Sequence, residues 1–67
     1  MSIIYKFDEV DTNTMYIGEA ATNIATSEAF WKIRKLSKSG SVTSILYADG
    51  NDEFDNIWDN RTSLSYT

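Results

Sequence analysis

Acidic side chains are concentrated in one short stretch of the sequence, ADGNDEFDNIWDNR, at residues 48–61. Its carboxylates belong to Asp49, Asp52, Glu53, Asp55 and Asp59. Calcium takes about six to eight oxygen ligands, and the known calcium loop places acids at alternate positions before a central glycine. Here Gly50 follows a single aspartate, and the side chains of Asp52 and Glu53 diverge because the two residues are neighbours. The spacing therefore favours solvated turn acids over a metal site.

The sequence lacks the residue types and motifs on which most catalytic sites depend. The sequence contains no cysteine and no histidine, which excludes disulfides, Cys/His zinc sites and catalysis by either residue. Paired carboxylates can hydrolyse glycosides, but a chain of 67 residues has little room for a substrate pocket. No glycine-rich phosphate loop is present in the sequence. We therefore expect no enzymatic activity, no cofactor and no small-molecule substrate.

Four of the six basic residues lie within KIRKLSK at positions 32–38. In an extended strand Lys32, Arg34 and Lys38 share one face, whereas Lys35 points to the other. Such a stripe beside Phe30 is one candidate for binding single-stranded nucleic acid, and a solvated sheet face is the simpler alternative. A third hypothesis pairs this basic segment with the acidic segment 49–59 of another copy, because complementary charge sets register and partner choice. The candidate interface residues are Lys32, Arg34, Lys35, Lys38, Asp52, Glu53 and Asp55.

Composition limits the partners. The net charge of −4 predicts repulsion from nucleic acid phosphates and anionic membranes over most of the surface. The sequence has no apolar run long enough to span a membrane, and its start, MSIIYKF, does not have the features of a signal peptide. We therefore expect a protein made in the cytoplasm, with neither a membrane nor nucleic acid as its partner.

Nine aromatic residues are more than a single small sheet can cover. Each can bury about 150–250 Å², and most are expected in the core. A chain of this length hides only about 60% of its unfolded surface, so its core is marginal and a partner is a common remedy. The surplus of aromatic rings therefore predicts a contact surface for another chain.

Alternating side chains predict two strands near the start of the chain. In SIIYKF, residues Ile3, Tyr5 and Phe7 point one way and the residues between them the other. MYIGEA continues as a second strand, in which Gly18 marks a bulge or a close backbone approach. The polar segment 8–14 supplies turn residues, so the two strands should form an antiparallel hairpin with a long loop.

The sequence around the end of the crossing loop at 21–29 fits either a strand or a helix. SEAFWKIRKLSK has helical spacing at Ala29, Ile33 and Leu36. We favour a strand, because KSGS is a hairpin turn and VTSILYA is a second strand that needs an antiparallel neighbour. In that hairpin Trp31 and Ile33 are expected to lie across from Tyr47 and Ile45.

The final segment predicts one helical turn near residues 53–59, because Phe54, Ile57 and Trp58 have the spacing of one helical face. We expect these three side chains to pack into the open end of the core. We expect Asp59 and Arg61 to hold the turn in place through hydrogen bonds. SLSY then adds a short C-terminal strand. The expected fold is mostly β over residues 1–67 as a single domain, with two antiparallel hairpins in a small sheet or sandwich. Its expected core and clasp residues are Trp31, Ile33, Tyr47, Phe54, Ile57, Trp58, Asp59 and Arg61.

Three blocks, YIGEAAT, TSEAFWKIRKL and YADGNDEFDNIWDNRTSLSY, resemble a family of short tailed-phage proteins. That family shows a YIGEA-like opening, a tryptophan with an I-x-[RK] strand and a closing ADG…F.N.WDNR.SL.Y block. The resemblance covers residues 16–66 and implies a minor virion component, in capsid decoration or in the tail, neck or fibre. It implies no catalytic residues, and its partners would be other virion proteins or copies of itself. The alternative is a small acidic phage-encoded inhibitor of a host protein.

Overall fold

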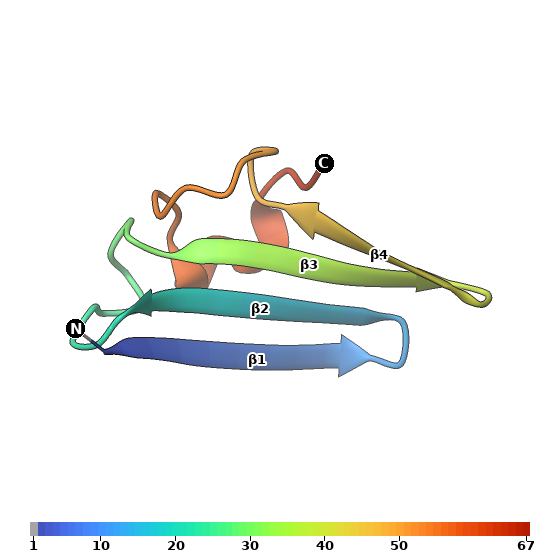
Figure 1. Cartoon of the computed structure of the whole chain (residues 1–67), viewed down its shortest axis with the longest axis horizontal. Helices are drawn as coiled ribbons and strands as arrows, with labels where there is room; N and C mark the ends of the chain where they lie inside the picture. Colours follow the sequence, from blue (N-terminus) through green and yellow to red (C-terminus); the bar gives the residue numbers. More distant parts are fainter. Residues whose placement is uncertain (1) are drawn as a thin grey trace.

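The structure is a computed structural model that describes residues 2–67. Four strands, β1 (Ile3–Asp11), β2 (Thr14–Ala21), β3 (Lys32–Ser39) and β4 (Val42–Tyr47), form one antiparallel sheet in chain order. A 3₁₀ helix, η1 (Trp58–Ser63), follows the sheet, as Figure 1 shows. The prediction of a mostly β fold built from two antiparallel hairpins is confirmed, and the strands form a single open sheet.

The first hairpin has a shorter loop than the sequence predicted. β1 extends to Asp11 and pairs there with Thr14, so only Thr12 and Asn13 form the turn. The Asp11 carboxylate accepts the Asn13 N–H at 2.7 Å, which holds the tight turn in place. A register shift between Glu9 and Asp11 places a bulge in β1. Gly18 pairs regularly with Lys6, so it marks a close approach and not a bulge.

The strand preferred for residues 32–38 is confirmed, but its predicted register is wrong. Arg34 lies opposite Tyr47 and Leu36 opposite Ile45, whereas the sequence predicted Trp31 and Ile33 at those positions. The turn consists of Gly40 and Ser41 alone, with Gly40 at φ +62°, as a two-residue hairpin turn requires. This turn moves the pairing by three residues, and an odd shift exchanges the two faces of a strand.

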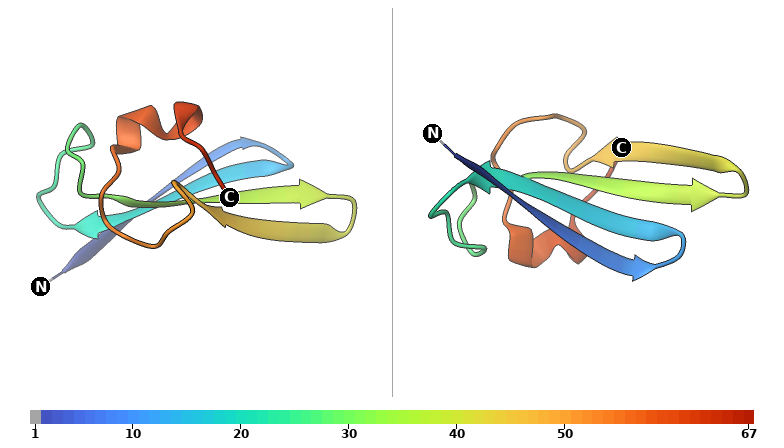
Figure 2. Two further views of the ribbon diagram at one scale, coloured as in Figure 1. Left: turned by 90° about the horizontal axis from the view of Figure 1, so that it is seen from above. Right: turned by 60° about the horizontal axis from the view of Figure 1, so that its bottom comes forward.

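Alternation divides the sheet into two faces. The covered face carries Tyr16, Gly18 and Ala20 of β2 beside Ile33 of β3. Helix η1 lies across this side of the sheet, as the two views of Figure 2 show. The core on the covered face is formed by Tyr16, Ala20, Trp31, Ile33, Ala48 and Trp58.

Two tryptophans dominate this core. Trp31 is fully buried, Trp58 is 6% exposed, and their ring centroids lie 5.8 Å apart. The ring of Trp58 rests on the backbone of Gly18, where an added Cβ would lie 2.6 Å from Cζ3 of Trp58. A side chain at position 18 would therefore displace the indole, which explains the glycine in a strand interior.

The helical turn begins later than the sequence predicted, at residue 58 and not near 53. Asn56 pairs with Trp31 through two backbone hydrogen bonds of 2.9 and 3.0 Å, so the chain is extended there. As a result Trp58 alone enters the core. Ile57 is half-buried, and Phe54, expected in the core, is 43% exposed. Helical spacing was misleading because residues 54–57 are not helical.

The segment after η1 joins the sheet through one bridge, Ala48–Tyr66, in place of the predicted C-terminal strand. We call residues 58–66 the clasp segment. Arg61 ties it to β1, because its Nε donates to Asp8 Oδ2 at 2.9 Å and its guanidinium lies 4.6 Å from the Trp58 ring centroid. The hydroxyl of Tyr66 donates to the Arg61 carbonyl at 2.7 Å. The side chain of Asp59 is exposed. Asp59 is held by its backbone N–H, which donates a hydrogen bond to the Thr26 carbonyl at 3.1 Å.

Candidate interaction surface

The second side of the sheet, which we call the open face, is rich in apolar side chains. They come from all four strands, because the register of the sheet places one set of alternate residues on this side. The apolar members of the open face are Ile3, Tyr5, Phe7, Met15, Ile17, Leu36, Ile45 and Tyr47.

Several of these side chains are in contact with solvent. Tyr5, Phe7 and Ile45 are 52%, 63% and 56% exposed. The clasp segment packs against the other side of the sheet (Figure 2). Soluble monomers rarely expose a contiguous apolar patch of more than a few hundred Å² unless it has a function. The open face is therefore the candidate functional site of this protein.

A charged cluster crosses the middle of the open face. Glu19 Oε1 accepts a hydrogen bond from Arg34 Nη2 at 3.2 Å and lies 3.8 Å from Lys32 Nζ. The Nε of Arg34 is buried and has no hydrogen-bond partner within residues 2–67. The cluster neutralises part of the basic stripe, so this face is not the uniformly basic surface that nucleic acid binding would favour.

Charge is divided between the two halves of the open face. Its acids, Glu9 and Glu19, belong to β1 and β2, whereas its bases, Lys32, Arg34 and Lys38, all belong to β3. The face therefore has an acidic half and a basic half that meet at the boundary between β2 and β3.

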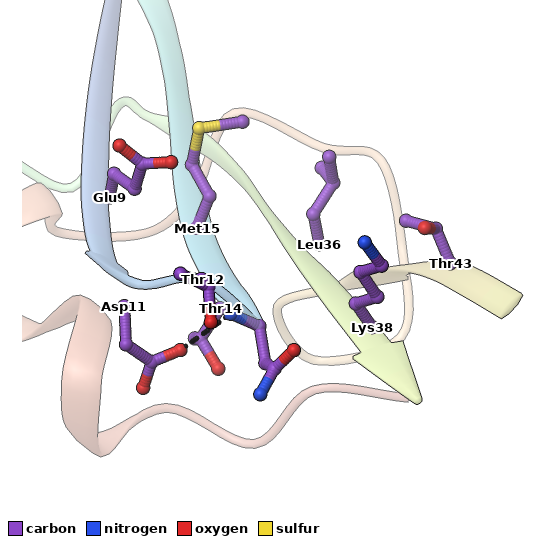
Figure 3. Close-up of a pocket in the computed structure, with 9 residues that line it drawn as sticks. Glu9, Asp11, Thr12, Thr14, Met15, Leu36, Lys38 and Thr43 are labelled. Carbon is purple, nitrogen blue, oxygen red and sulfur yellow. Dashed lines mark hydrogen bonds between the residues drawn. The ribbon is translucent and has the colours of Figure 1, made fainter. Parts of the chain in front are cut away.

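A depression of about 160 Å³ lies at the turn end of the open face. Met15 and Leu36 lie between Glu9 and Asp11 on one side and Lys38 on the other (Figure 3). A second depression, of about 370 Å³, lies at the opposite end of the sheet and has an entirely apolar lining of Ile3, Ala21, Ile24, Phe30 and Phe54. Both ends of the face thus offer recesses for side chains of a partner.

The basic residues predicted as an interface divide between the two faces. Lys32, Arg34 and Lys38 share the open face, as the strand pattern predicted. Lys35 lies on the covered face, with its Nζ 6.0 Å and 5.7 Å from the ring centroids of Tyr16 and Tyr66. Lys35 therefore packs on the aromatic rings of the covered face. It cannot join Lys32, Arg34 and Lys38 in one interface on the open face.

The acids of residues 52–55 lie in the loop between β4 and η1. Asp52, Glu53 and Asp55 are all exposed. The described part of the chain brings no three metal-ligating side chains together. None of the helices within residues 2–67 has the length and apolarity needed to cross a membrane.

The sequence predicted a surplus of aromatic rings but did not predict where they lie. Tyr47 was expected in the core, whereas the structure places it half-buried on the open face, opposite Arg34. Glu19 was not predicted as a site residue. The signal that could have located this face is the alternation of Ile3, Tyr5 and Phe7, which puts three large apolar groups on one side of β1.

Comparison with protein-family models, curated proteins and solved structures gives no match for this chain.

Proposed function

We propose that this chain is a non-enzymatic structural protein of a phage virion that contacts neighbouring chains through its β-sheet and its aromatic side chains. The observation that carries the proposal is the apolar open face. A protein whose sheet leaves Tyr5, Phe7 and Ile45 more than half exposed is suited to permanent contact with another protein, because obligate interfaces resemble a core divided in two. The resemblance to short tailed-phage proteins supports a place in capsid decoration or in the tail, neck or fibre.

Purified particles of the phage that encodes the chain test this proposal. We expect mass spectrometry to find the protein in a fixed stoichiometry to the major virion proteins. Particles produced with Ile45→Asp, on the open face, should contain less of it, because a buried unpaired carboxylate is costly. The control Val42→Asp changes an equally exposed residue on the other side of β4 and should leave its amount unchanged. Purified particles without the protein would contradict the proposal.

One observation favours a second candidate, a small acidic inhibitor of a host protein. The exposed carboxylates of Asp52, Glu53 and Asp55 give one loop a local negative charge, in a chain whose net charge is −4. Such a loop can bind a basic site on another protein. Pull-down from host extract should then recover a specific protein, and recovery should fall when the three acids are changed to Asn or Gln. If the parent and the variant without the three acids recover the same amount of host protein, this candidate is excluded.

A further inference from the structure

We propose that the open face binds the open face of a second copy of this chain, around a twofold axis that runs parallel to the strands between β2 and β3. This inference rests on the proposed structural function, because it names the first neighbouring chain. The two sheets would form a sandwich, in which each copy supplies the cover that the other lacks.

Charge selects this axis. Two sheets that stack face to face keep their strands within about 30° of each other, which allows a twofold axis along the strands or one across them. An axis across the strands stacks each strand on its own copy, so Lys32 and Arg34 of β3 would meet the same basic strand. An axis along the strands stacks β2 on β3, and Glu19 then faces Lys32 of the second copy, with Arg34 in the adjacent row. Only the second arrangement brings opposite charges together.

The same axis sets which side chains of the two open faces meet. Phe7, Ile17, Arg34 and Tyr47 form one row across the sheet, and Glu9, Met15, Leu36 and Ile45 form the next. Rotation about the axis reverses each row, so Phe7 faces Tyr47 of the second copy and Met15 faces Leu36. Ile17 then faces Arg34, and Ile45 faces Glu9, so the alkyl parts of the two charged side chains lie against aliphatic ones. Each row therefore contributes one kind of apolar pair to the interface.

The area of the face predicts a moderate affinity. Four strands about 4.8 Å apart, with lengths near 25 Å, give a face of about 500 Å² per copy. The pair would bury about 1,000 Å² in total, which is close to the lower limit for a specific interface. We therefore expect a monomer–dimer equilibrium that depends on protein concentration and on salt.

Sedimentation velocity on the purified chain, from about 1 to 500 µM, tests the dimer. We expect a concentration-dependent dimer for the parent and at least about a tenfold higher dissociation constant for Ile45→Thr, because symmetry removes two apolar side chains. The matched control is Val42→Thr, with the same strand, the same chemistry and similar exposure but the other face. Its dissociation constant should stay within about twofold of the parent. A monomer at every concentration, or equal effects of the two variants, would overturn the proposal.

A charge exchange tests the axis itself. Glu9 and Lys38 are exposed, and in the proposed dimer Lys38 of one copy lies near Glu9 of the other. Glu9→Lys alone and Lys38→Glu alone should each weaken self-association, more strongly at low salt than at high salt. An equal mixture of the two variants should recover the dimer, because the exchanged charges again attract. If the mixture is as weak as each variant, the proposed axis is wrong. Dimers that tolerate every open-face change would indicate pairing of β1 edges and would also overturn the proposal.

The two proposals can fail separately. A chain that is present in purified virions but stays monomeric contradicts the dimer and leaves the structural function in place. A chain that dimerises as described but is absent from virions contradicts the proposed function and retains the dimer.

Discussion

At the scale of single residues, Trp58 has the largest role in the fold, because it closes the core from outside the sheet. Its ring contacts Trp31, covers Gly18 and carries the guanidinium of Arg61. Trp58→Ala should lower the free energy of unfolding by about 3–5 kcal/mol, which is a large part of the stability of so small a domain. Urea unfolding followed by circular dichroism measures this loss.

The control for this prediction is Phe54→Ala. Phe54 is an aromatic residue four positions before Trp58, but it is 43% exposed, so its removal should cost less than about 1 kcal/mol. Equal losses for the two variants would show that Phe54 contributes to the core as much as Trp58 does.

Gly18 allows a second test at this scale. Gly18→Ala should destabilise the fold by about 1–3 kcal/mol, because the new methyl group overlaps the indole of Trp58. In a Trp58→Leu background the same change should cost less, because the smaller side chain leaves room for the methyl group. A double-mutant cycle in chemical denaturation measures this coupling. If the losses in free energy of unfolding from Gly18→Ala and Trp58→Leu simply add, the cost of the alanine does not come from its contact with Trp58.

The partly buried hydroxyl of Tyr66 makes the free energy of unfolding sensitive to alkaline pH. Burial raises the pKa of the Tyr66 hydroxyl well above its ordinary value of 10, and the neighbouring Tyr16 raises it further. The unfolded chain therefore loses this proton near pH 10 while the folded chain retains it, so the free energy of unfolding falls as the pH rises above about 10. Tyr66→Phe should make that fall less steep than in the parent. Unfolding curves at several pH values between about 9 and 11.5 give the comparison, and equal slopes would contradict the assignment.

At the scale of elements, the tie between Arg61 and Asp8 holds the clasp segment to β1. Arg61→Ala removes an ion pair of 2.9 Å and a cation over Trp58, whereas Asp8→Asn removes only the charge of the pair. We expect about 1–2 kcal/mol for the first change and less than about 1 kcal/mol for the second. Amide hydrogen exchange should show faster opening of residues 58–63 in Arg61→Ala, with little change in β2 and β3. Uniform acceleration would indicate that the segment does not open separately.

The elements also show how far the sequence predicts this fold. Alternation identified the strands, and the turn sequence KSGS at residues 38–41 identified the second hairpin. The predicted register was wrong because the turn is limited to Gly40 and Ser41, which shifts the pairing by three residues, and an odd shift reverses the faces of the strand. Local patterns could not show which side of the sheet is covered, because Ile3, Tyr5 and Phe7 have the pattern of a core-facing set. The position of Trp58 over Gly18 decides the covered side, and that contact joins residues 40 positions apart.

At the scale of the whole molecule, self-association would add to stability. A ligand that binds only the folded state raises the melting temperature as its concentration rises, and here the ligand is the chain itself. We expect the melting temperature of the parent to increase with protein concentration between about 5 and 500 µM, and Ile45→Thr to remove most of this increase. Differential scanning calorimetry measures both. A melting temperature independent of concentration in the parent would contradict a dimer of the folded chains.

The order of the elements along the chain has a consequence for biosynthesis. All four strands precede the clasp segment in the sequence. The core around Trp31 is therefore incomplete until Trp58 packs against it. A chain that has formed only its strands therefore has a sheet with both faces bare until residues 58–66 reach it. Exposed strands of this kind aggregate readily, so a chain truncated before residue 58 should accumulate as aggregate and not as folded protein.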